Sequence, residues 1–122
     1  MESLSNIKIK ILDKEIASII IDESKTYNSL SFRNLGDLIQ AFKKLDNDKK
    51  IKVIIIEGAG KGFSAGHNLK EVNGLKNKAK YQKLFNLCSK LMLHIVEGKK
   101  PVIAKVHGAA FAAGCQLVAS CD

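Results

Sequence analysis

The stretch "VIIIEGAGKGFSAGHNLKEV", from Val53 to Val72, decides how this chain folds. Its first part, extended backwards to Ile51, is a nearly continuous apolar run that ends in the glycine-rich segment "GAGKG". Such a run is typical of a strand that is buried on both faces of a parallel sheet. The glycine-rich loop should therefore leave the sheet at the carboxyl end of that strand, where open α/β folds bind their ligands.

The segments before this strand predict a hairpin followed by a helix. The alternating "IKIKIL" (Ile7–Leu12) and the β-branched "EIASIII" (Glu15–Ile21) are separated by a short polar turn, which is typical of two antiparallel strands. Ser31 is a candidate N-cap for a helix whose apolar residues recur every three or four positions until "DNDKK" at residues 46–50. The chain thus brings a helix to the strand at Val53.

The segments after the strand repeat this alternation. An apolar stripe from Tyr81 to Ile95 predicts a helix that ends at Gly98. "PVIAKVHG" (residues 101–108) predicts another strand, and a last helix should begin near Gly114. The order predicts an α/β fold with crossover connections and at least one parallel pair of strands.

Composition limits the partners. The net charge of +8 comes from 20 Lys and Arg against 12 Asp and Glu, but Arg33 is the sole arginine and aromatics make up only 6%. Because the lysines are spread along the chain without interleaved aromatics, a solvated surface is favoured over nucleic-acid binding, while a polyanionic small molecule remains compatible. No nucleic-acid partner is predicted.

The sequence also predicts a cytoplasmic protein without a membrane partner or a metal. No apolar run is long enough for a span, and "MESLSNIKIK" has neither a secretory nor a transit pattern. The three cysteines, Cys88, Cys115 and Cys121, lack metal-ligand spacing. We expect them to be reduced thiols in or near the core.

Two loops of small residues, "EGAGKGFSAG" and "HGAAFAAG", follow the two predicted parallel strands. Small residues let backbone N–H groups approach a ligand, and the second loop ends at a helix N-terminus, which favours negative charge. The loops can therefore hold an oxyanion, although such loops also serve simply to turn the chain. "GFSAG" has the GxSxG form, which leaves open a serine hydrolase with Ser64 as nucleophile.

Three separated motifs carry a resemblance to a known family. The quoted stretch, "KPVIAKVHGAAFAAGCQLVASCD" and "SKTYNSLS" (residues 24–31) closely resemble the enoyl-CoA hydratase/isomerase (crotonase) superfamily, and the ending is most similar to its hydratase-domain-containing subgroup. The resemblance implies a crotonase-like spiral of strand-strand-helix repeats about twice this length. Residues 1–122 should then be the truncated N-terminal part of a single crotonase-like domain, which assembles as a homo-trimer or hexamer when complete.

The resemblance also implies a site and a substrate. In the family, the thioester carbonyl of an acyl-CoA lies between two backbone N–H groups, and these correspond here to His67 and Ala113. The substrate would be an acyl-CoA of fatty acid metabolism, with no cofactor beyond the CoA thioester. The residues that should surround the nucleotide part of CoA are Lys25, Ser29, Ala65, Leu69 and Lys70.

One position departs from the family's catalytic pattern. Hydratases of this family use two glutamates as general acid and base, and Gln116 stands at the first of these positions, while the second would follow Asp122. An amide cannot exchange a proton, so it can only position a water or a carbonyl. The chain could accordingly be a hydratase- or isomerase-like enzyme, a non-catalytic acyl-CoA-binding protein, or an incomplete chain without activity of its own.

Overall fold

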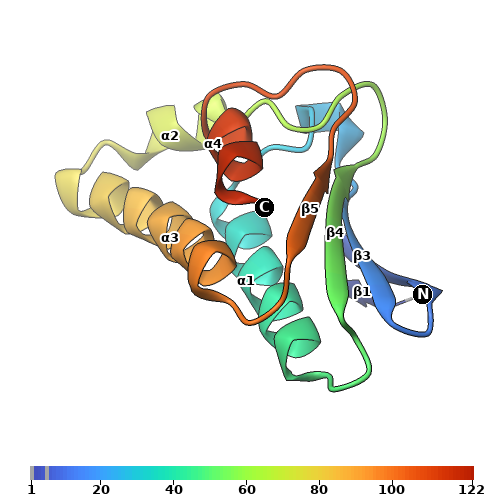
Figure 1. Ribbon diagram of the computed structural model, residues 1–122. Helices are drawn as coiled ribbons and strands as arrows, with labels where there is room; N and C mark the ends of the chain where they lie inside the picture. Colours follow the sequence, from blue (N-terminus) through green and yellow to red (C-terminus); the bar gives the residue numbers. More distant parts are fainter. Residues whose placement is uncertain (1, 5) are drawn as a thin grey trace.

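The computed structural model describes residues 2–4 and 6–122, which form one five-stranded sheet with helices packed against it (Figure 1). The strands stand in the order in which they occur in the chain. They are β1 (Glu2–Leu4), β2 (Ile7–Asp13), β3 (Ile16–Ile21), β4 (Val53–Gly58) and β5 (Val102–Lys105). The helices are the 3-10 turn η1 (Ser24–Thr26) and α1 (Phe32–Asn47), α2 (Leu69–Leu75), α3 (Lys78–Glu97) and α4 (Ala113–Ser120).

The predicted hairpin is confirmed. β2 pairs antiparallel with β3, with Ile7 opposite Ile21, and the register shifts between Ile11 and Asp13. β1, which also pairs antiparallel with β2, was not predicted, because three residues are too few to show an alternating pattern. The hairpin places Ile7, Ile19 and Ile21 in the core.

The predicted parallel pairing is confirmed as well, since β4 lies between β3 and β5 and runs parallel to both. The expectation that β4 is buried on both faces is wrong. Ile54 and Ile56 are buried, whereas Val53 and Ile55 are partly exposed. The reason is that the helices of the described chain lie on one side of the sheet (Figure 1).

The predicted start of α1 is confirmed, and α2 and α3 also begin at capping side chains. The Ser31 side chain accepts a hydrogen bond from the Asn34 N–H at the start of α1. Asn68 and Asn77 cap α2 and α3 in the same way, and Gly98 follows the last residue of α3. α3 packs against α1 and α4. Its buried residues are Leu84, Cys88, Leu91, Met92 and Ile95.

The cysteines differ in their environments. Cys88 is buried and Cys121 is half-buried, but Cys115 is exposed, so the expectation of core or near-core thiols is wrong for Cys115. Burial raises the pKa of the Cys88 thiol, and burial together with the neighbouring Asp122 carboxylate raises the pKa of Cys121 to about 11. All three thiols are free. In the part of the chain that the structure describes, no group of three or more His, Cys, Asp or Glu side chains is placed to hold a metal ion.

A membrane-spanning helix would have to be both long and apolar. Over residues 2–4 and 6–122, none of the helices has both the length and the apolar character that a membrane crossing requires.

Candidate active site

The two small-residue loops meet directly. The loop after β4 and the loop after β5 continue the parallel pairing of their strands through an isolated bridge between Ser64 and Ala110. The Phe63 N–H donates to the Ala109 carbonyl at 2.9 Å, and the Phe111 N–H donates to the Ser64 carbonyl at 3.0 Å. Main-chain hydrogen bonds therefore fix the two loops relative to each other.

Glycines permit this close approach. Gly66 has a φ of +90°, and a Cβ placed on it would lie 3.0 Å from the Phe111 oxygen and 3.1 Å from the Ala113 nitrogen. A Cβ on Gly114 would lie only 2.4 Å from the Ser64 oxygen. Side chains at these two positions would push the loops apart, so the sequence must have glycine there.

Two amides at this junction have no internal partner. Within residues 2–4 and 6–122, neither the His67 N–H nor the Ala113 N–H donates a hydrogen bond, whereas the neighbouring Gly66 N–H donates to the Ser64 hydroxyl and the Gly114 N–H to the Phe111 carbonyl. The His67 amide directly follows Gly66, the residue that lies against the Ala113 nitrogen. Ala113 is only 6% exposed, and unpaired buried N–H groups are rare. The junction thus carries two unused donors on adjoining segments.

Backbone strain accompanies the second donor. Ala112, which precedes α4, has φ 49° and ψ −120°, a conformation that side chains rarely adopt, and no side chain caps the helix. Such residues cost about 1–3 kcal/mol and persist only where the surrounding structure imposes them. The preceding residue, Phe111, donates its N–H to the Ser64 carbonyl of the first loop, and Ala112 is followed directly by the free N–H of Ala113.

Asn28 joins a third segment to the junction. It adopts a left-handed conformation with φ 54° between η1 and α1 and is 1% exposed. Its Nδ2 donates to three carbonyls of the β4–α2 loop, those of Ala59, Gly62 and Phe63, and its Oδ1 accepts from the Glu23 N–H. Sequence reasoning missed this role. The available signal was an asparagine in a tight connection, because asparagine tolerates the left-handed region.

Ser64 is part of the same hydrogen-bond network rather than a nucleophile. Its hydroxyl donates to the Asn28 carbonyl at 2.8 Å, accepts from the Gly66 N–H, and is buried with 1% exposure. His94, a candidate base downstream in the sequence, lies on α3 with its Nε2 3.0 Å from an Asp46 carboxylate oxygen on α1. The serine-hydrolase alternative is therefore wrong.

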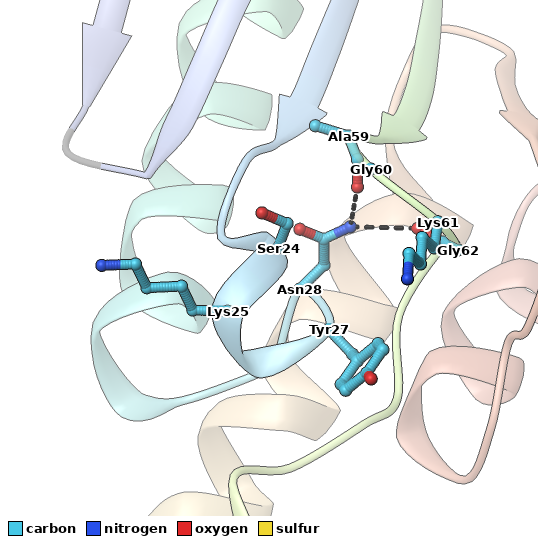
Figure 2. A pocket seen from close by; sticks show the side chains of 8 residues that line it. All are labelled: Ser24, Lys25, Tyr27, Asn28, Ala59, Gly60, Lys61 and Gly62. Atoms are coloured by element: carbon cyan, nitrogen blue, oxygen red, sulfur yellow. Dashed lines mark hydrogen bonds between the residues drawn. The ribbon is translucent and has the colours of Figure 1, made fainter.

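A cavity of about 490 Å³ lies beside Asn28. Figure 2 shows Lys25 on η1 and Lys61 on the β4–α2 loop, on opposite sides of the Asn28 side chain. Lys61 was not among the residues expected to contact a ligand, because "GAGKG" fits no phosphate-binding motif. The cavity nevertheless has a lysine on each side.

A second cavity of about 300 Å³ brings together most of the residues expected around CoA. Ser29 is not among its lining residues, since its side chain is 2% exposed and its hydroxyl donates to the Glu23 carboxylate at 3.2 Å. The residues expected around CoA that line the cavity are Lys25, Ala65, Leu69 and Lys70, and His67, expected as an oxyanion donor, lines it as well.

The side chains of His67 and Gln116 lie in different surroundings. The His67 Nδ1 donates to the Leu30 carbonyl at 3.1 Å, and its ring meets the Phe85 ring edge-on with centroids 5.4 Å apart. Gln116 lies in the first turn of α4 with its side chain exposed. The His67 ring is thus anchored, with Nε2 as its remaining nitrogen, while Gln116 faces solvent.

Comparisons with known proteins bear on the family of this chain. The Enoyl-CoA hydratase/isomerase family pattern matches residues 12–122. The human protein named enoyl-CoA hydratase domain-containing protein 3, mitochondrial, is 43% identical over 107 residues, which make up 88% of this chain and 35% of that protein. Its Xenopus laevis counterpart is 40% identical over 121 residues, or 98% of this chain and 41% of that protein.

Solved structures give the same result. The crystal structure of human enoyl-CoA hydratase domain-containing protein 3 superimposes with a TM-score of 0.90 at 41% identity, and that of enoyl-CoA hydratase from Bacillus anthracis with a TM-score of 0.93 at 28% identity. Each match covers 97% of this chain and 46% of the other, so the chain spans less than half the length of these relatives. The expected crotonase-like α/β fold is confirmed. The chain belongs to the enoyl-CoA hydratase/isomerase family.

Proposed function

We propose that this chain binds an acyl-CoA and polarises its thioester carbonyl with the backbone N–H groups of His67 and Ala113. The observation that carries the proposal is that these two amides are unpaired and lie on segments in contact. A fixed donor aimed at a developing oxyanion stabilises the transition state by about 2.7–4 kcal/mol. Because both donors belong to the main chain, the histidine side chain at residue 67 is compatible with this role.

The surroundings of the two amides fit the rest of such a ligand. Lys25 and Lys61 flank one cavity, and Lys25 and Lys70 line the other, so cations are available to the phosphates of CoA. A third, almost wholly apolar cavity of about 220 Å³ between the loops, lined in part by Ala65 and Phe111, fits an uncharged part of the ligand. Ser29 lines none of these three cavities, and its hydroxyl donates to the Glu23 carboxylate instead.

Proton transfer is where this chain departs from a hydratase. Hydration of an enoyl thioester needs a base to deprotonate water and an acid to protonate the α-carbon, and each positioned group is worth about 10²–10⁴ in rate. Gln116 can supply neither. This amide favours a second candidate function, which is binding of acyl-CoA with polarisation but without hydration.

Calorimetric titration of acetyl-CoA into the folded chain tests binding. We expect saturable heat with the unmodified chain and loss of it in Gly66→Ala, whose Cβ would displace the Ala113 nitrogen. Gly74→Ala is a matched control, because nothing lies within 4 Å of that position. Absence of binding in a sample with a cooperative unfolding transition would refute the proposal.

Loss of enoyl absorbance from crotonyl-CoA tests the chemistry. We expect no turnover by this chain and none by Gln116→Glu, because the two carboxylates of such a site act as a unit. Joined to the C-terminal half of a catalytic relative, the Gln116→Glu chain should turn over about 10² times faster than its Gln116 parent. Fast turnover by the unmodified chain would instead assign proton transfer to another group, with His67 the first to be tested.

Assembly and location stay predictions. A homo-trimer or hexamer is proposed for the complete protein, and sedimentation velocity would measure it. The expected cytoplasmic location is opposed by the word "mitochondrial" in the names of several relatives, which applies to those proteins. Imaging of a tagged full-length protein would distinguish the two compartments.

A further inference from the structure

Lysines are spread along the whole chain, but acids are nearly absent from its C-terminal part. Between Glu71 and Asp122 the chain has a single acid, Glu97. The same stretch contains eight lysines, which are Lys76, Lys78, Lys80, Lys83, Lys90, Lys99, Lys100 and Lys105. The first four of them, all exposed, form what we call the α2–α3 lysine cluster. Over the described residues, none of these four pairs with a carboxylate.

The cluster lies next to the cavity that we propose for the nucleotide part of CoA. α2 begins at Leu69 and Lys70, which line the cavity of about 300 Å³, and it ends at the cluster. Seven helical residues span about 10 Å, which equals the Debye length of roughly 10 Å at 0.1 M salt. Figure 1 shows α2 and the start of α3 on the side of the molecule away from the sheet, so the sheet does not cover the cluster.

The helix itself does not benefit from these charges. Lys78 and Lys80 occupy the first turn of α3, which contains no acid. The positive end of the helix dipole disfavours cations at this place. Asn77 supplies the cap, so the lysines are not needed to begin the helix. A role in attracting an anion explains their position better than a role in folding.

We propose that the α2–α3 lysine cluster steers acyl-CoA into the cavity by long-range attraction. This inference rests on the proposed function. Coenzyme A carries a pyrophosphate and a phosphate monoester, and a field of one sign beside a site raises the rate of encounter without any lasting contact. The cluster should therefore act on the association rate constant, whereas Lys25, Lys61 and Lys70 act on the bound state.

Stopped-flow binding of an acyl-CoA with a fluorophore on its acyl chain tests the proposal. The variant replaces Lys76, Lys78, Lys80 and Lys83 with glutamine. Summing screened Coulomb terms over four lysines predicts an association rate constant about fivefold lower, or more, at 20 mM ionic strength. At 0.5 M the association rate constants of the variant and the unmodified chain should agree within about twofold. At each salt concentration the two proteins should have the same dissociation rate constant.

A charge-matched control separates local steering from net charge. Lys14, Lys49, Lys50 and Lys52 are exposed at the opposite ends of β3 and β4 from the loops, and their replacement with glutamine lowers the net charge by the same amount. We expect this control to retain most of the association rate constant at 20 mM. Circular dichroism and thermal unfolding of each variant establish that it is folded.

Four results would overturn the inference. An unchanged association rate constant in the cluster variant would show that the cluster exerts no field at the cavity. An equal loss in the control would assign the effect to net charge. A change confined to the dissociation rate constant would make the lysines direct contacts. Absence of binding by the unmodified chain at either salt would refute the proposed function and this inference with it.

Discussion

Removal of the Asn28 side chain is the sharpest test of how the site is held together. Asn28→Ala leaves the Ala59, Gly62 and Phe63 carbonyls and the Glu23 N–H without their partner. The bond to Phe63 is buried, and an unsatisfied buried group costs about 1–3 kcal/mol, while the part-buried groups regain water and each lose about 0.5–1.5 kcal/mol. We expect the free energy of unfolding to fall by about 3–5 kcal/mol, because alanine is also disfavoured at a φ of 54°.

Two further variants separate the contributions. Asn28→Gly loses the same hydrogen bonds but relieves the backbone, so it should be about 1 kcal/mol more stable than Asn28→Ala. Asn73→Ala, at an exposed position of α2, is the control and should change stability by less than about 0.5 kcal/mol. Urea unfolding followed by circular dichroism gives all three values. A loss below about 1 kcal/mol in Asn28→Ala would refute the view that this side chain holds the loops.

Four further predictions concern the loops and the thiols. Gly66→Ala should destabilise the chain by about 1–3 kcal/mol in urea unfolding, because of its φ of +90° and its contact with Phe111, and an unchanged midpoint would contradict the close approach. Ser64→Ala should cost about 1–3 kcal/mol, and the unmodified chain should not react with a fluorophosphonate, since the hydroxyl is buried and bonded; labelling would contradict this. A thiol reagent at pH 8 should modify Cys115 first, as mass spectrometry of the Cys115→Ser variant would check. The raised pKa of Cys121 favours the folded state below pH 9, and this contribution should disappear between pH 9 and about 11; an equal decline in Cys121→Ser would contradict it.

Local signals gave most of the elements. The hairpin of β2 and β3 follows from alternation and β-branching, and the start of α1 from Ser31, because the forces that form these elements act between residues near in sequence. The second face of β4 could not be predicted in this way. Its burial depends on which distant helices cover the sheet, and an apolar run is compatible with either answer.

In the candidate site, too, the features that depend on local sequence could be predicted, whereas those that depend on contacts between distant residues could not. The glycine spacing indicated loops that allow close approach, and the loops do meet at Gly66 and Gly114. The bonds of Asn28 and Ser64 join residues more than thirty positions apart, and no local pattern encodes such a pairing. The presence of Lys61 and Lys25 at one cavity likewise depends on the folded arrangement of two segments that are distant in sequence.

The hydrogen bonding between the two loops has a consequence for directed evolution. Their contacts run from amide to carbonyl at Phe63, Ser64, Ala109 and Phe111, so they survive most changes of side chain. In a library randomised at Ala65, His67 and Phe111, variants selected for binding new thioesters should be diverse. Randomisation of Gly66 should return glycine almost alone. The main-chain contacts between the loops should therefore stay constant, while the side chains that line the loops can vary under selection.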